Sequence, residues 1–292
     1  MIPNRIRITG LTDAIQKMKE YGIPDLATFF LVYEAKNQVL SEETVLSQME
    51  KALDAMEESI QKGKLKANIT PSGLIQGGAL KVNNFLAEGK SILSPAFTDV
   101  IYTTLAVAEL NACMGRIVAA PTAGASGVLP GAFLTIAKNQ KTSREKTIQS
   151  LFVAGGIGEV IALRASLAGA SHGCQAENGS ASAMTAAALC YLSVSDPVIV
   201  ESSACFALKN LLGLVCDPVA GLVEVPCVKR NVVASVNAVA CAEMALAGIQ
   251  TVIPFDEVVD AMEQIGNSMP SSLKETSQGG LAVCNACKRY CL

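Results

Sequence analysis

The 292-residue chain contains no tryptophan and one histidine, and aromatic side chains make up 4% of it. Half of the residues are apolar, and most of these are alanine, valine, leucine or isoleucine. Large rings therefore fill little of the interior, and the composition is typical of helices that pack closely through small side chains. A chain of this length can bury a sizeable core within one large domain.

Charged residues are also few, and neither sign dominates. The charged residues amount to 17% of the chain, the net charge is −3, and no basic block stands out. Nucleic-acid binding proteins usually carry a basic patch or stripe. We therefore expect no nucleic acid partner and a solvated, mixed-charge surface.

Long uninterrupted apolar runs are missing as well. The two longest, 117–137 and 232–253, are broken by proline in the first and by polar residues in the second. A membrane-spanning helix needs about 20 nearly uninterrupted apolar residues. The start, MIPNRIRITG, has no apolar run behind its arginines, unlike a signal peptide. We expect a soluble cytoplasmic protein with no membrane association.

Cysteine is abundant, with ten in the chain. Without a secretory signal, a disulfide framework is not expected. Cys113, Cys190, Cys205 and Cys241 lie within apolar, helix-like runs. Because a free cysteine packs like a small hydrophobic residue, these four are predicted to belong to the core.

The sequence pattern predicts an all-α fold. In segment 41–63 the apolar positions recur every three or four residues, with Ser41 as N-cap and Gly63 as the end of the helix. After residue 66, small apolar runs alternate with Gly-rich turns at 71–78, 121–131, 155–159, 168–173 and 216–221. The segment LVEVPCV is the only strand-like piece, and Pro226 weakens it. A last amphipathic helix is predicted over 255–266.

No linker marks a domain boundary, so we expect one catalytic domain over 1–292. Residues 1–65 are predicted to form peripheral helices. Residues 283–292 are predicted to form a Cys-rich tail.

Three cysteines, Cys174, Cys216 and Cys227, lie in or beside turns, and we call them the turn cysteines. A turn lets a thiolate point inward while backbone N–H groups reach the sulfur, as at iron–sulfur clusters. Their separations of 42 and 11 positions match no compact ferredoxin or zinc pattern. From spacing alone, a zinc site and inert thiols remain alternatives. Three thiolates on a four-iron cube would leave one iron open as a Lewis acid.

Three long motifs carry a resemblance: GGIGEVIALRASLAGASHGCQAENGSASAM, CDPVAGLVEVPCVKRN and SLKETSQGGLA. They closely resemble the iron–sulfur-dependent L-serine dehydratases (L-serine ammonia-lyases), from about residue 10 to 282. The length is similar to the separate alpha chain of the two-chain form. The resemblance implies a mainly helical catalytic domain and a smaller beta chain as partner. It also implies a [4Fe–4S] cluster held by Cys174, Cys216 and Cys227, and L-serine as the substrate.

The remaining site residues are expected around the turn cysteines. The small residues of the loop Thr122, Ala123, Gly124, Ala125, Ser126 and Gly127 predict a nest of backbone N–H groups for the substrate carboxylate. His172 and Lys229 are the expected catalytic residues beside the cluster or the substrate, the histidine not as the base. Asn178 is expected at the substrate. Glu159 and Glu177 are candidates for orienting His172 or the substrate, while Arg230 would balance negative charge.

The tail contributes one more expected ligand. In some single-chain relatives a C-terminal cysteine reaches the open iron, and Cys287 lies at about the matching distance after Ala282. Cys284 and Cys291 are alternatives. Thr276, Ser277 and Gly279–Gly280 are expected to line the site where the tail folds back.

The implied reaction converts L-serine to pyruvate and ammonia. Many amino acid dehydratases use pyridoxal phosphate on a lysine Schiff base, but no lysine here lies in a recognisable motif for it, so no pyridoxal phosphate is expected. The rival hypotheses are a related cluster-dependent L-cysteine desulfidase and a non-catalytic iron or redox sensor. The Gly-rich turns weigh against the sensor.

Overall fold

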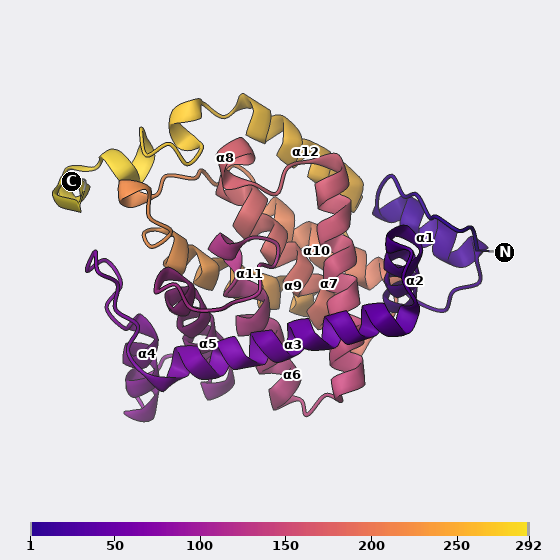
Figure 1. Cartoon of the computed structure of the whole chain (residues 1–292), viewed down its shortest axis with the longest axis horizontal. Coiled ribbons are helices and arrows are strands. Elements are labelled where there is room, and N and C mark those ends of the chain that lie inside the picture. The colour runs from indigo at the N-terminus through magenta and orange to yellow at the C-terminus, as the bar shows by residue number, and fades with distance from the viewer. Residues whose placement is uncertain (1, 291–292) are drawn as a thin grey trace.

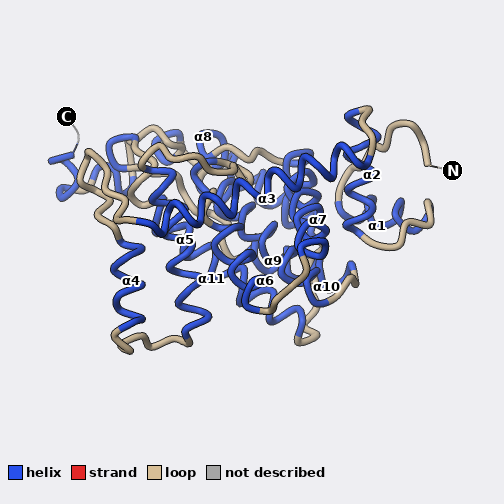
Figure 2. Tube along the Cα trace, turned by 60° about the horizontal axis from the view of Figure 1, so that its bottom comes forward, coloured by secondary structure: helices blue, strands red, loops and turns tan. Residues whose placement is uncertain are grey.

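The computed structural model describes residues 2–290, which form helices and turns and no strand in that range (Figure 2). This confirms the all-α prediction. The α-helices are α1 (Leu11–Glu20), α2 (Leu26–Gln38), α3 (Glu42–Leu65), α4 (Gly78–Ala87), α5 (Pro95–Ala112), α6 (Thr135–Asn139), α7 (Arg144–Arg164), α8 (Gly169–His172), α9 (Ser180–Ser193), α10 (Pro197–Lys209), α11 (Cys227–Leu246) and α12 (Phe255–Ser268).

Short 3-10 and π-helical turns connect these helices. They are η1 (Ala123–Ala125), η2 (Pro130–Leu134), η3 (Gln175–Gly179), η4 (Val219–Gly221), η5 (Ser271–Leu273), η6 (Gly280–Val283) and η7 (Asn285–Tyr290). The last three occupy the segment after α12, which runs past α8 to the opposite end of the molecule from the N-terminus (Figure 1). This segment is turn-rich, as the sequence predicted.

Helix α9 is the centre of the core. Its sequence, SASAMTAAALCYLS, is buried on almost every face, and α7, α10 and α11 pack around it. A helix that is apolar all round is a core helix, and alanine and serine let neighbouring helices approach closely. The core cysteines follow this pattern, since Cys190, Cys205 and Cys241 are buried in helices as predicted. The core prediction was wrong for Cys113, which is half-buried because it caps the C-terminus of α5.

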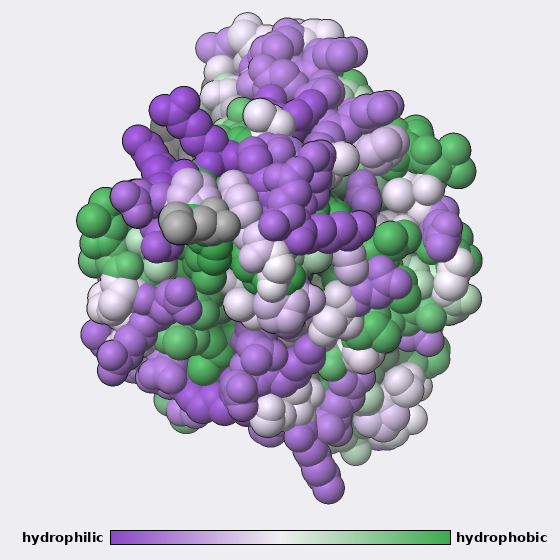
Figure 3. All heavy atoms as spheres, turned by 90° about the vertical axis from the view of Figure 1, so that its right-hand side faces the viewer, coloured by the Kyte–Doolittle hydropathy of each residue, from purple (hydrophilic) through white to green (hydrophobic). Residues whose placement is uncertain are grey.

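The N-terminal helices contribute unequally to this core. In α3, Ser41 accepts a hydrogen bond from the Thr44 amide, and Val45, Leu53 and Met56 are buried, as the sequence predicted. Helix α2 places Phe29, Phe30 and Tyr33 within the main core cluster. The face of the molecule around the N-terminal helices is mostly polar, with smaller apolar areas between the charged side chains (Figure 3).

Two glycine predictions were wrong for the same reason. Gly63 does not end α3, which continues to Leu65, and the segment 155–159 is no turn but part of α7. An added Cβ would come 2.3 Å from Ala106 O at Gly63 and 2.2 Å from the Phe30 ring at Gly156. These glycines serve close helix contacts, which the sequence alone does not separate from turns.

Two further sequence predictions concern the last third of the chain. The strand-like segment LVEVPCV forms turns and the start of α11, with no strand. The final helix is confirmed as α12, in which Val258, Val259 and Met262 are buried.

Helix α7 is long and apolar enough to cross a membrane by length and composition. However, 67% of that apolar window is buried inside the protein, where α7 packs against α2 and α9. It therefore has the surroundings of a core helix in a soluble protein.

Candidate functional site

The three turn cysteines are buried, with exposures of 1% for Cys174, 4% for Cys216 and 9% for Cys227. Each is placed by a different element. Cys174 immediately precedes the π-helical turn η3, Cys216 lies in the loop between α10 and η4, and Cys227 is the first residue of α11. Cys227 therefore lies at the positive end of the α11 dipole.

Their electrostatics show that the turn cysteines are neighbours. Burial, together with the nearby charge of Cys174, raises the pKa of Cys227 to about 12. Burial likewise raises the pKa of Cys216, with added contributions from Cys174 and Cys227. Three thiols that disfavour one another's ionisation need an electropositive group between them to become thiolates together.

Donors already face one of these sulfurs. Asn178 Nδ2 donates to Cys174 Sγ at 2.9 Å, from one helical turn further along η3. Burial raises the pKa of Cys174, while Asn178 and Arg230 lower it. Hydrogen bonds of this kind stabilise a thiolate and tune a metal bound to it.

Three buried polar atoms, in the loop at 122–127, in η3 and at the start of α9, have no hydrogen-bond partner within residues 2–290. They are Ser126 Oγ, Asn178 Oδ1 and Ser180 Oγ. Such atoms are rare in folded proteins, and each calls for an explanation. Within the described residues, no three His, Cys, Asp or Glu side chains are arranged to hold a single metal ion. Three buried thiols suit an iron–sulfur cluster, in which the thiolates bind different iron atoms.

The loop at 122–127 is clamped to the start of α11 by Asn231. Asn231 Oδ1 accepts from the Gly127 amide at 2.9 Å, and its Nδ2 donates to Gly124 O at 2.7 Å and to Cys227 O at 3.0 Å. The amides of Ala125 and Ser126 donate within the loop. This leaves the amides of Thr122, Ala123 and Gly124, on the more accessible half of the loop, for a ligand.

Glu177 lies between this loop and the turn cysteines. Its Oε1 accepts from Thr122 Oγ1 at 2.8 Å. An added Cβ on Gly169 would come 2.7 Å from Glu177 Oε2 and 3.1 Å from Cys216 Sγ, so the carboxylate and that sulfur share one small space. Burial raises the pKa of Glu177, as does the charge of Glu275, whereas the Thr122 hydrogen bond lowers it.

The C-terminal segment is fastened to the loop of Cys216. The Cys216 amide donates to Leu273 O at 2.9 Å, and the Glu275 amide donates to Cys216 O at 2.8 Å. Asp217 Oδ2 accepts from the Leu281 amide at 2.8 Å, while its Oδ1 lies 2.9 Å from Arg230 Nη2. The segment after α12 therefore forms one wall beside Cys216.

The comparison with known proteins assigns the chain to a family. The family model described as "Serine dehydratase alpha chain" matches residues 11–282. The chain belongs to the serine dehydratase alpha chain family.

Named relatives agree with this assignment. The chain is 46% identical over 269 residues to the "Probable L-serine dehydratase, alpha chain" of Bacillus subtilis, covering 92% of this chain and 88% of that one. It is 43% identical to the "L-serine dehydratase, alpha chain" of Peptoniphilus asaccharolyticus, covering 92% of each. The "L-serine dehydratase" of Mycobacterium tuberculosis is 40% identical over 79% of this chain, which spans 52% of that protein.

Within this serine dehydratase alpha chain, His172 faces α12. Its Nε2 lies 2.8 Å from Glu263 Oε2, and Gly266 packs against the ring so closely that a Cβ would come 1.9 Å from Cδ2. Its Nδ1 has no hydrogen-bond partner in the described part of the chain. These contacts connect α8, and through it Cys174, to α12.

Two other residues that the sequence placed at the site, Lys229 and Glu159, have different surroundings. Lys229 is exposed on the first turn of α11, near enough to Glu109 to affect its ionisation. Glu159 Oε1 accepts from Tyr33 OH of α2 at 2.9 Å, whereas the carboxylate beside His172 is that of Glu263. The expectation that Glu159 could orient His172 was therefore wrong, because α7 continues through residues 155–159 and turns that side chain towards α2.

In the tail, Cys284 is exposed and its Sγ contacts Gly280 O at 3.8 Å, and Cys287 is half-buried in η7. Cys291 lies outside the described residues. Ser277 donates to Pro218 O at 2.8 Å and Thr276 donates to Ser271 O at 2.9 Å, so both fasten the segment after α12.

Glu177 is the residue whose importance sequence reasoning underestimated. The available signal was its position three residues after Cys174 in HGCQAENG, which places it on the same side of a helical turn. Asp217 and Asn231 were missed entirely. Asp217 follows Cys216 directly and Asn231 lies one helical turn after Cys227, so both could have been found by the same reasoning.

Proposed function

We propose that this chain is the cluster-binding subunit of an L-serine ammonia-lyase, which converts L-serine to pyruvate and ammonia together with a beta chain. The observation that carries the proposal is the burial of Cys174, Cys216 and Cys227 as neighbours in a member of the serine dehydratase alpha chain family. These three cysteines would hold a [4Fe–4S] cluster. Such a cluster, when bound, supplies an open iron as a Lewis acid for the substrate hydroxyl.

The loop at 122–127 is assigned to the substrate carboxylate. The amides of Thr122, Ala123 and Gly124 belong to its more accessible half, and Asn231 bonds the loop to the backbone carbonyl of Cys227. Backbone N–H groups in such a nest bind anions well. Lys229 is exposed on the first turn of α11, two residues after Cys227, and a role for its positive charge at the substrate stays a prediction.

Glu177 is assigned to the substrate ammonium group. Its carboxylate is fixed by Thr122 at one end of the loop and lies beside Cys216. An amino acid held by its carboxylate on the loop would bring its ammonium group to this negative side chain. Asn178 and Arg230 stabilise the Cys174 thiolate, and His172 positions Cys174 through its contact with α12.

The reaction removes the α-proton and the β-hydroxyl of serine, and the resulting aminoacrylate tautomerises to an imine that hydrolyses to pyruvate. Proton removal needs a base near the α-carbon. In this proposal the beta chain supplies that base. A capping role for Cys287, with Cys284 or Cys291 as alternatives, stays a prediction.

The test uses single Ser substitutions of Cys174, Cys216 and Cys227 in protein purified anaerobically with its beta chain. We expect each variant to lose both cluster iron and pyruvate formation. Cys241→Ser is the matched control, because Cys241 is buried in α11 away from the turns. Unchanged iron content in all three variants would refute the proposal.

Two further measurements separate the rival functions. Turnover of L-cysteine in preference to L-serine would favour the desulfidase. Equal serine turnover with and without the beta chain would remove that partner from the proposal.

A further inference from the structure

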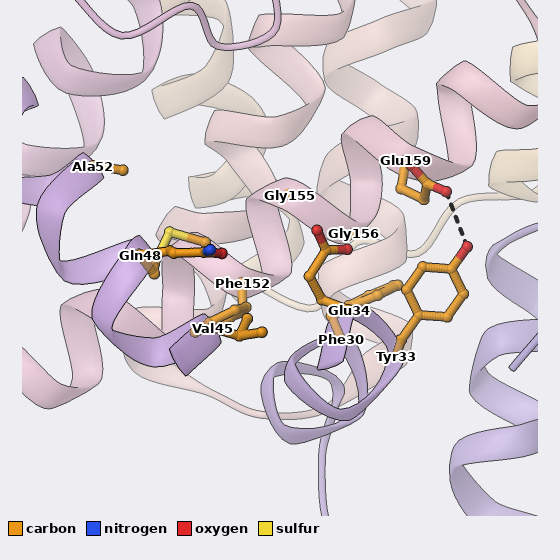
Figure 4. A pocket seen from close by; sticks show the side chains of 11 residues that line it. Phe30, Tyr33, Glu34, Val45, Gln48, Ala52, Phe152, Gly155, Gly156 and Glu159 are labelled. Atoms are coloured by element: carbon orange, nitrogen blue, oxygen red, sulfur yellow. Dashed lines mark hydrogen bonds between the residues drawn. The ribbon is translucent and has the colours of Figure 1, made fainter. Parts of the chain in front are cut away.

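A cavity of about 330 Å³ lies between α2, α3 and α7, and none of the residues assigned to the reaction lines it (Figure 4). Its lining consists of Phe30, Tyr33, Glu34, Val45, Gln48, Met49, Ala52, Phe152, Gly155, Gly156 and Glu159. Sites for small molecules usually measure about 300–1,000 Å³. The cavity is therefore large enough for a small organic molecule.

The ionisable side chains that line the cavity are acidic. Glu34 and Glu159 both line it, and none of the described lining residues is basic. Glu159 Oε1 accepts from Tyr33 OH at 2.9 Å, and Glu34 accepts from Gln38 on its own helix. Burial raises the pKa of Glu34, and the charge of Glu159 raises it further. A cation between the two carboxylates would relieve this repulsion.

The rest of the lining is apolar and partly aromatic. Phe30 and Phe152 are buried side chains of the main core cluster, and Val45 and Met49 face them from α3. Aromatic rings attract cations and also bind the hydrocarbon part of a ligand. A free amino acid fits poorly, because its carboxylate would meet two glutamates and no basic group.

Gly155 leaves the cavity open on the side of α7. It lies in the middle of α7, where glycine costs about 0.5–1 kcal/mol relative to alanine. An added Cβ there would meet nothing within 4 Å. Every other glycine in residues 2–290 either has a positive φ or packs against a neighbouring atom. Packing and backbone conformation within the chain therefore explain the other glycines but not Gly155.

We propose that this cavity binds a small organic cation, with an ammonium group between Glu34 and Glu159 and an apolar part against Phe30 and Phe152. The absence of a side chain at Gly155 keeps the cavity open beside the backbone of α7. Figure 4 shows Glu34 and Tyr33 from α2 and Glu159 from α7 among the lining side chains, with the hydrogen bond between Tyr33 and Glu159.

The first experiment titrates the full chain with 2-phenylethylammonium by isothermal calorimetry. Neutral 2-phenylethanol and anionic 3-phenylpropionate are matched probes of nearly the same shape. We expect the alcohol to bind at least about tenfold more weakly than the ammonium and the anion not to bind. Equal affinity for the alcohol, or no binding of the ammonium, overturns the proposal.

Substitutions then locate the site. Glu34→Gln and Glu159→Gln keep the side-chain shape, and each should weaken ammonium binding about tenfold. Glu43→Gln on α3 removes the same charge from an exposed position outside the cavity and should leave binding unchanged. Binding that survives both cavity substitutions refutes the assignment.

Gly155 provides a variant that cannot be dismissed as misfolded. Gly155→Leu should abolish binding because the side chain fills the cavity, while the melting temperature stays the same or rises because leucine favours a helix more than glycine does. Full binding in this variant contradicts the proposal. All these measurements record binding without turnover, so they stand or fall independently of the dehydratase activity.

Discussion

The side-chain amide of Asn231 is the strongest single connection between the loop at 122–127 and the turn cysteines. It is 1% exposed and makes three hydrogen bonds, to the Gly127 amide, Gly124 O and Cys227 O. Asn231→Ala removes all three and leaves one buried donor and two acceptors to find new partners. A hydrogen bond contributes about 1 kcal/mol net, and an unpaired buried group costs about 1–3 kcal/mol. We therefore expect the free energy of unfolding to fall by about 3 kcal/mol.

Urea denaturation of the chain without its cluster measures this loss, since bound metal would add its own stabilisation. Asn139→Ala, an exposed residue at the end of α6, is the control and should change the free energy by less than about 0.5 kcal/mol. In the cluster-loaded enzyme with its beta chain, a displaced loop should raise KM for serine about tenfold, equivalent to about 1.4 kcal/mol of binding.

The reasoning would be refuted by a destabilisation below about 1 kcal/mol, because buried hydrogen bonds of this geometry cannot be lost at so small a cost. A large destabilisation with unchanged KM would keep the clamp but remove the loop from the substrate site.

Three further predictions follow from buried groups. Burial raises the pKa of Cys227 from 9.0 to about 12, so the stability contributed by the neutral Cys227 thiol is complete below pH 9 and is lost as the pH rises towards about 12. The urea midpoint of the cluster-free chain should therefore fall between these pH values. In Cys227→Ser the midpoint should fall less steeply. Asp217→Asn leaves Arg230, whose side chain is 16% exposed, without its charge partner. This substitution should lower the free energy of unfolding by about 3 kcal/mol. It should also speed proteolysis of the segment after α12, which mass spectrometry can time. Gly131→Ala would place a Cβ 2.1 Å from Thr104 Oγ1. It should therefore lower the free energy of unfolding by about 1–3 kcal/mol. No measurable change would argue against the close contact of η2 with α5.

Much of the fold could be predicted from residue patterns. The apolar spacing of α3 and α12 and the N-cap at Ser41 are local properties, and the structure has them. The glycines were harder, because Gly63 and Gly156 are required by Ala106 and Phe30, which lie far away in the sequence. A local pattern cannot distinguish such a contact from a turn.

The candidate site, like the fold, could be predicted from the sequence only in part. Burial of Cys174, Cys216 and Cys227 beside turns could be inferred from their flanking residues and from the family resemblance. The partners of Glu177 and Glu159 could not, since each depends on which side of a helix faces which neighbour. Glu177 meets Thr122 and Glu159 meets Tyr33, contacts that span 55 and 126 positions.

The hydrogen bonds between Cys216 and residues 273–275 have a consequence for shortened versions of the protein. Trimming everything after α12 would remove the acceptor of the Cys216 amide, the donor to its carbonyl and the amide that Asp217 binds. Residues 273–281 thus help to hold the backbone that carries the Cys216 sulfur, and a crystallisation or expression design that omits them would remove these hydrogen bonds.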